Sequence, residues 1–101
     1  MTDFTLHDKE SAPEKSKPLL DNSLKAFGMI PGLHAVMAEA PGILEGYQKL
    51  HELVLDSSFD NDEKTVVWQT INVENACHYC VPAHTGIAKM MDVSDDITNA
   101  L

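Results

Sequence analysis

The sequence predicts an all-α fold: a small helical bundle that completes its core by oligomerisation. From Pro18 onward, apolar residues recur at three- and four-residue steps, which is the spacing of one face of a helix. These stretches are bounded by glycine, proline or residues that favour helix capping. A chain of 101 residues also buries a smaller share of its surface than a long one, so association with further copies would help to complete the core.

Composition and charge narrow the class of protein. Hydrophobic residues make up 44% and charged residues 23% of the chain, as in soluble globular proteins. The net charge of −9 disfavours binding to nucleic acid or to anionic membranes, and no Lys/Arg cluster provides a local exception. No apolar run approaches the roughly 20 residues of a membrane span, and the acidic N-terminus does not resemble a secretory signal. We therefore expect a cytoplasmic protein, in which a close cysteine pair is catalytic or metal-binding.

The order of elements follows from the breaks in this pattern. Residues 1–17 mix charge with serine and proline without periodicity, which predicts a mobile N-terminal arm. Residues 18–101 form the predicted helical domain. Within it we expect helices over 18–27 with Gly28 at the end, 32–39, 41 to near 56, 60 to about 75, 78–91 and 95–101.

Local signals support the later helices. Asp60 followed by Glu63 resembles a capping box, and Pro82 falls in the first turn of its helix, where a proline is tolerated. Ser94 is the expected N-cap of the last helix. This helix stops without a C-terminal cap, from which we expect the chain to be a fragment of a longer protein.

A pair of cysteines lies at the start of the predicted helix 78–91. Cys77 and Cys80 are separated by two residues, and His84 follows one helical turn after Cys80. A thiolate is the nucleophile toward a peroxide or a disulfide, and the N–H groups of a helix start favour the negative charge of a thiolate. His84 lies at the right spacing to exchange a proton with Cys80, while the position of Glu74 depends on the turn that precedes the pair.

This arrangement predicts different roles for the two sulfurs. Cys80 is closer to His84, so we expect it to attack and to become a sulfenic acid. Cys77 would then resolve the sulfenic acid to a disulfide, which an external dithiol must reduce.

The pattern Glu-x-x-Cys-x-x-Cys-x-x-x-His, from Glu74 to His84, resembles the carboxymuconolactone decarboxylase family, and within it the alkylhydroperoxidase D-like (AhpD-like) branch. The similarity covers residues 31–101, including the Pro-Gly-Ile-Leu-Glu-Gly-Tyr segment at 41–47. The resemblance implies an all-α AhpD-like bundle, a homo-oligomer (trimer or hexamer) and hydroperoxide reduction. It also implies that Cys80 is peroxidatic, that Cys77 is resolving, and that His84 belongs to a proton relay.

Two positions depart from the family pattern. Thr65 stands where the branch has a relay glutamate, and Tyr79 stands where it has a histidine. Glu63 and Glu74 are the candidates to replace the missing glutamate.

Other interpretations of the motif remain open. The pair could be a buried apolar pair or an inert disulfide, or it could exchange disulfides with a protein or small molecule. Cys77, Cys80 and His84, with His78 or His51 as a fourth ligand, could instead bind zinc in a non-catalytic helical module. Structural zinc usually joins two separated ligand pairs, and no second pair is present. We therefore expect no bound metal. We also expect no cofactor, and from the charge and the lack of an apolar span we expect neither nucleic acid nor a membrane as a partner.

Overall fold

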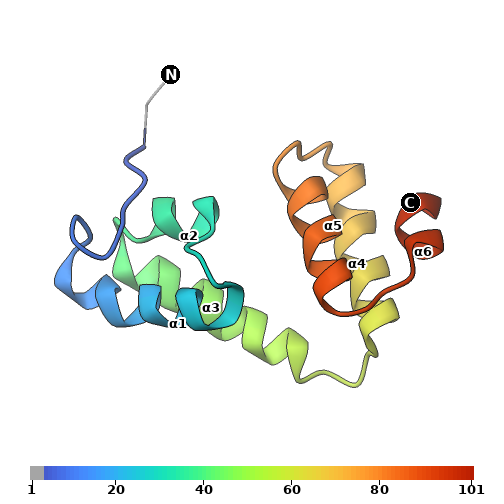
Figure 1. The fold of residues 1–101 in the computed structure, drawn as a ribbon, viewed down its shortest axis with the longest axis horizontal. Helices are drawn as coiled ribbons and strands as arrows, with labels where there is room; N and C mark the ends of the chain where they lie inside the picture. The colour runs from blue at the N-terminus through green and yellow to red at the C-terminus, as the bar shows by residue number, and fades with distance from the viewer. Residues whose placement is uncertain (1–3) are drawn as a thin grey trace. The chain divides into compact units, whose positions relative to one another are not determined.

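The computed structural model describes residues 4–101, and every regular element in them is helical, as predicted (Figure 1). None of these helices is both long enough and apolar enough to cross a membrane. The elements are a 3-10 helix η1 (Glu14–Ser16) and the α-helices α1 (Lys17–Phe27), α2 (Gly32–Met37), α3 (Pro41–Leu55), α4 (Asn61–Glu74), α5 (Cys80–Met90) and α6 (Asp95–Ala100).

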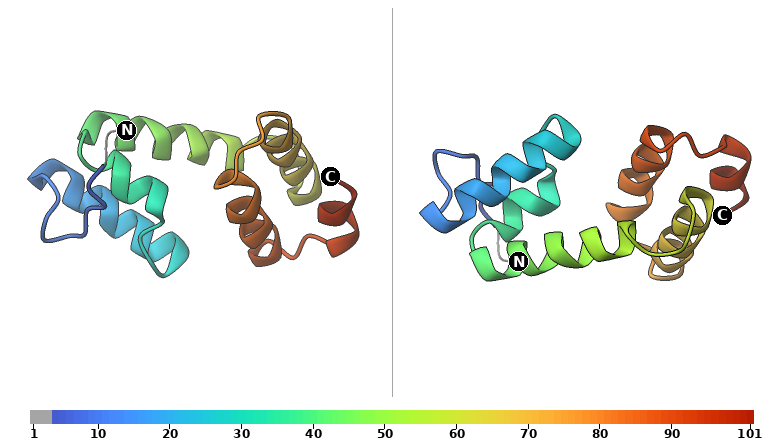
Figure 2. Two further views of the ribbon diagram at one scale, coloured as in Figure 1. Left: turned by 90° about the horizontal axis from the view of Figure 1, so that it is seen from above. Right: turned by 90° about the horizontal axis from the view of Figure 1, so that it is seen from below.

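The chain divides into two compact units, one up to Leu53 and one from Val54 onward. The first unit contains η1, α1, α2 and most of α3, and its core is formed by four buried apolar residues and three partly buried ones: Ala12, Leu20, Ala38 and Leu44, with Leu19, Ile30 and Met37. The second unit contains α4, α5 and α6. In it α4 packs chiefly on α5, and Figure 2 shows these two helices side by side from two further directions.

Part of the predicted N-terminal arm packs on the first unit, although its first three residues lie outside the described part. The ring of His7 contacts the carboxylate of Glu39, and the buried Ala12 joins the core. Ser16 is also buried, and its hydroxyl donates a 2.6 Å hydrogen bond to a carbonyl at the end of α2. The sequence carried no signal for this packing, because so few side chains of the segment are buried that they make no periodic pattern.

A polar network lies inside the first unit, around the buried His34 of α2. Ser23 Oγ and His34 Nδ1 are 2.6 Å apart, and the side-chain amide of Gln48 donates to Ser23 Oγ at 3.1 Å. The ring of Tyr47 meets His34 edge-on and stacks on His51. Burial lowers the pKa of both histidines, and for His34 the charge of His51 lowers the pKa further.

The predicted helix boundaries are confirmed at several termini. Asp60 Oδ1 accepts from the N–H of Glu63 at 2.8 Å, and Glu63 Oε1 accepts from the N–H of Asp60 at 2.9 Å, so the capping box is formed. At the other end of α4, Asn75 is the C-cap. Gly28 ends α1 with φ of 72°, and Ser94 caps α6 through its hydroxyl.

The two faces of α4 have an unusual distribution of side chains. Its buried positions are polar, with Thr65 at 2% and Gln69 at 3% exposure. The buried Lys64 donates to the carbonyl of Leu55 at 2.6 Å. The exposed positions include four apolar residues: Val66, Val67, Ile71 and Val73. Two of the buried polar residues of α4, Lys64 and Gln69, therefore hydrogen-bond to other segments of the chain.

Candidate redox site

The site begins in a tight turn between α4 and α5. Ala76 has φ of 50°, a left-handed conformation that residues other than glycine and asparagine seldom adopt. Within this turn the N–H of Cys77 donates to the carbonyl of Asn72 at 3.0 Å, and that of Ala76 donates to the carbonyl of Val73 at 3.0 Å. The turn reverses the chain, so that α5 returns alongside α4 (Figure 1).

The two cysteines are bonded to each other as a disulfide at the start of α5, and their Cα atoms are 5.3 Å apart. This Cα separation lies within the usual range for disulfides. Cys77 closes the turn, while Cys80 is the first residue of the helix. The predicted position of the pair at a helix N-terminus is therefore confirmed. Both residues are half-buried, so the sulfurs are neither fully enclosed nor fully exposed.

One hydrogen bond distinguishes the two sulfurs. The backbone N–H of Cys80 donates to Cys77 Sγ at 3.1 Å. The first N–H groups of a helix have no carbonyl partner within the helix, so this donor is available to the sulfur. In the dithiol form the same donor would face a thiolate, and hydrogen bonds to a charged acceptor are stronger than those to a neutral one. The sequence did not indicate which sulfur would receive the donor.

A partly buried amide network joins α4 to the first turns of α5. Gln69 Nε2 donates to the carbonyl of Val81 and to Thr85 Oγ1, both at 3.1 Å. Thr85 Oγ1 itself donates to the Val81 carbonyl at 2.8 Å. Asn72 Nδ2 donates to Gln69 Oε1 at 3.1 Å and lies 3.5 Å from the carbonyl of Cys80. Through this network, and through the turn, α4 holds the backbone on both sides of the disulfide.

Gln69 and Asn72 are not predicted by the sequence pattern. Neither residue belongs to the cysteine motif, and a glutamine among valines carries no sign that it faces inward. Their spacing of three residues, which places them on one helix face, is a signal that could have been used.

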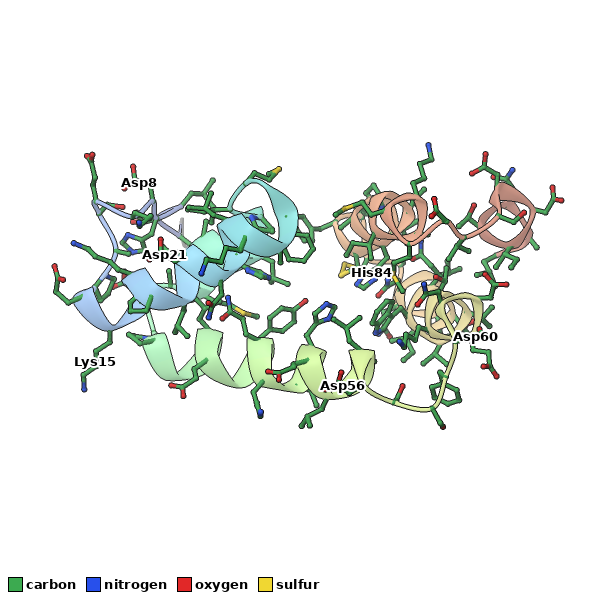
Figure 3. The ribbon with its side chains drawn as sticks, turned by 60° about the horizontal axis from the view of Figure 1, so that its bottom comes forward. Asp8, Lys15, Asp21, Asp56, Asp60 and His84 are labelled. Atoms are coloured by element: carbon green, nitrogen blue, oxygen red, sulfur yellow. A yellow bond between two sulfur atoms is a disulfide. The ribbon has the colours of Figure 1, made fainter. Side chains whose placement is uncertain are left out.

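His84 lies on α5, half-buried, one turn after Cys80 (Figure 3). Its ring packs against that of Trp68 on α4, with 5.0 Å between the ring centroids and 49° between the planes. The imidazole is therefore positioned by contact with a neighbouring helix. Its predicted role in proton transfer stays a prediction.

The two candidate relay carboxylates lie at opposite ends of α4. Glu74 is the last residue of this helix, two residues before the turn at Ala76, and is exposed. Glu63 lies in the first turn, where its carboxylate accepts the hydrogen bond of the capping box. Of the two, Glu74 is the one near the cysteine turn.

Three residues next to the cysteines are exposed. His78 and Tyr79, between the two cysteines, are exposed, and so is Pro82 in the first turn of α5. Among residues 4–101, no group of three or more His, Cys, Asp or Glu side chains is arranged to hold a metal ion. A zinc site built on Cys77 and Cys80 would also require both sulfurs as separate thiolates.

Comparison with protein-family models, with curated proteins and with solved structures finds no match to this chain. The likeness to the alkylhydroperoxidase D-like branch therefore rests on the motif between Glu74 and His84 and on the all-helical background.

Proposed function

We propose that this protein is a thiol-dependent peroxidase of the alkylhydroperoxidase D-like kind, which reduces hydroperoxides through Cys77 and Cys80. The observation that carries the proposal is the disulfide between these residues at the first turn of α5, with a backbone N–H directed at one of its sulfurs. A half-buried pair at a helix start can be reached by a small oxidant.

The proposed cycle balances atoms and electrons. The Cys80 thiolate attacks a hydroperoxide, ROOH; an S–O bond forms, the O–O bond breaks, and the departing alkoxide takes up a proton to become the alcohol. Cys77 then attacks the sulfur of the Cys80 sulfenic acid, so that a disulfide forms and hydroxide leaves as water after protonation. An external dithiol reduces this disulfide and is itself oxidised to a disulfide.

The other predicted residues serve proton movement in this proposal. His84 carries the proton between the Cys80 thiol and the leaving oxygen, because it follows Cys80 by one helical turn. Its packing on Trp68 limits the orientations of the imidazole ring. Glu74 is preferred over Glu63 as the relay carboxylate, since the Glu63 carboxylate is engaged in the capping box.

A second candidate function is the exchange of disulfides with a protein or small-molecule partner. The exposure of His78, Tyr79 and Pro82 favours disulfide exchange, because a bulky disulfide could approach the cysteines past these residues. Turnover with a hydroperoxide compared with turnover on a disulfide substrate, each coupled to the same dithiol, separates the two functions.

We also propose that the protein works as a homo-oligomer. Supporting this are the apolar residues exposed on α4, such as Val67 and Ile71, and on α3, such as Leu50. Exposed apolar side chains on consecutive turns of a helix are typical of surfaces that associate. Sedimentation equilibrium of the purified protein would distinguish a trimer or hexamer from the monomer that would contradict this proposal.

Two cysteine variants test the proposed peroxidase. We expect Cys80→Ser to abolish peroxide consumption, because the attacking sulfur is lost. We expect Cys77→Ser to consume about one equivalent of peroxide and then stop, because no disulfide can form. Peroxide consumption coupled to oxidation of a dithiol measures both, and the double variant gives the background.

Normal turnover by Cys77→Ser would contradict the division of roles between the two sulfurs. Absence of peroxide turnover in the unmodified protein, with rapid turnover on a disulfide, would replace the peroxidase by the second candidate.

A further inference from the structure

The two sulfurs of the disulfide have different environments. Cys77 Sγ accepts the N–H of Cys80 at 3.1 Å. Cys80 instead supplies the donor, and within residues 4–101 no hydrogen bond is found to Cys80 Sγ. The asymmetry is maintained by the backbone, because the N–H of Cys77 is itself held by the carbonyl of Asn72 at 3.0 Å.

We propose that the reducing dithiol attacks Cys80 and that Cys77 is the sulfur that leaves as a thiolate. This inference rests on the proposed redox cycle and specifies its reductive half. When a disulfide opens, negative charge develops on the leaving sulfur, and the better-stabilised thiolate leaves faster. A donor that already faces Cys77 Sγ needs no reorganisation as this charge appears.

Reduction of the disulfide by the dithiol takes two steps. One thiolate of the dithiol attacks Cys80 Sγ, which forms a mixed disulfide at Cys80 and breaks the bond to Cys77. The electron pair of the broken bond stays on Cys77 Sγ, where the N–H of Cys80 stabilises it. The second thiol of the reductant then attacks its own sulfur of the mixed disulfide and releases Cys80. The dithiol is oxidised by two electrons, and its two protons end on the released cysteines.

The position of Cys77 at the turn supports this direction of attack. The carbonyl of Cys77 accepts the N–H of Val81 at 3.2 Å, so both backbone groups of Cys77 are hydrogen-bonded and its sulfur leaves from an anchored position. The side chain of Asn72 lies 3.5 Å from the carbonyl of Cys80 and is tied to Gln69. The Asn72 side chain thus helps to position Cys80, while the backbone carbonyl of Asn72 holds Cys77.

A trapping experiment identifies the attacked sulfur. The oxidised protein is treated briefly with reduced glutathione, quenched in acid, and alkylated. Trypsin has no site between Lys64 and Lys89, so residues 65–89 form one peptide that carries both cysteines. Fragmentation of this peptide shows which sulfur carries glutathione. We expect glutathione on Cys80 and the alkyl group on Cys77, in about tenfold excess over the reverse pattern. Equal amounts, or glutathione chiefly on Cys77, would overturn the proposal.

Single-thiol variants provide a second measurement that does not depend on trapping. In Cys80→Ser the residue-80 N–H is retained, so the Cys77 thiol keeps its donor. We expect this thiol to react with iodoacetamide about tenfold faster, at about pH 6.5, than the Cys80 thiol of Cys77→Ser, because its thiolate has the donor. The attack of Cys80 on a peroxide depends instead on His84, which removes the proton of Cys80 during the reaction. Far-UV circular dichroism confirms that both variants are folded. Rates within about twofold of each other would contradict the asymmetry.

The role of Asn72 is tested with Asn72→Ala, for which Asn99→Ala on the exposed face of α6 is the matched control. We expect Asn72→Ala to reduce the preference for Cys80 in the trapping experiment, whereas Asn99→Ala leaves it unchanged. An unchanged preference in a folded Asn72→Ala protein would remove the Asn72 side chain from the positioning role.

These outcomes are separate from those that test the peroxidase. If the preference for Cys80 is found but no hydroperoxide is turned over, only the proposed peroxidase fails. If hydroperoxide is turned over but both sulfurs are attacked equally, only the present inference fails.

Discussion

Replacing Gln69 by leucine tests whether hydrogen bonding by this buried amide holds α5 against α4. The substitution removes three hydrogen bonds of 3.1 Å, which join Gln69 to Val81, Thr85 and Asn72. A typical intramolecular hydrogen bond contributes about 0.5–1.5 kcal/mol net. The Val81 carbonyl keeps the hydroxyl of Thr85 as a donor, and the buried leucine side chain gains transfer free energy, so part of the loss is offset. We expect a decrease of about 1–3 kcal/mol in the free energy of unfolding.

Urea unfolding followed by tryptophan fluorescence measures this free energy with a reporter on α4 itself. Trp68 is the single tryptophan of the chain and adjoins Gln69 on α4. Thr70→Leu is the matched control, because it introduces the same side chain at the next, exposed position of the same helix. We expect the control to stay within about 0.5 kcal/mol of the unmodified protein. A Gln69→Leu protein as stable as the control would refute the view that these hydrogen bonds stabilise the pairing of α4 and α5.

Three further predictions concern proton transfer, backbone conformation and pH. We expect His84→Phe to lower peroxide turnover, measured with dithiol in excess, by about 10²–10⁴-fold, because the variant keeps a ring against Trp68 but cannot carry a proton. A decrease of less than about threefold would exclude His84 as the proton carrier. Ala76→Gly should raise the free energy of unfolding by about 1 kcal/mol, because glycine adopts a positive φ without strain. A lower free energy of unfolding, measured in urea, would contradict this. Because burial, aided by the charge of His51, lowers the pKa of His34 in the folded state, the unfolded chain binds more protons below about pH 6.5. Stability should therefore fall as the pH decreases through about 6.5, and His34→Gln should weaken this dependence in unfolding curves recorded at several pH values.

Most helix boundaries could be predicted because they depend on local chemistry. Asp60 and Glu63 satisfy each other's backbone groups, and Gly28 supplies a left-handed residue, whatever the rest of the chain does. The cysteine pair at a helix start was predictable for the same reason, since its spacing and the following proline at position 82 are local features.

What could not be predicted depends on contacts between segments. The valines of α4 suggest an apolar face directed inward, but the structure directs Thr65 and Gln69 inward and leaves Val66 and Val67 exposed. The rotation of a helix about its axis is decided by its neighbours, here by acceptors on α5 that only the fold places opposite Gln69. The left-handed Ala76 is equally unexpected, because residues with this conformation are usually glycine or asparagine.

The polar inner face of α4 has a consequence for the register of the two helices. The hydrophobic effect does not depend on direction, whereas a hydrogen bond requires its donor and acceptor at a set distance and angle. A slip of α5 by one helical turn, about 5.4 Å, would carry Val81 away from the amide of Gln69 and leave a buried donor without its acceptor. The pairing of α4 and α5 therefore has one preferred alignment. The position of the disulfide along α4 is determined by Gln69, a residue eight positions before Cys77 in the sequence.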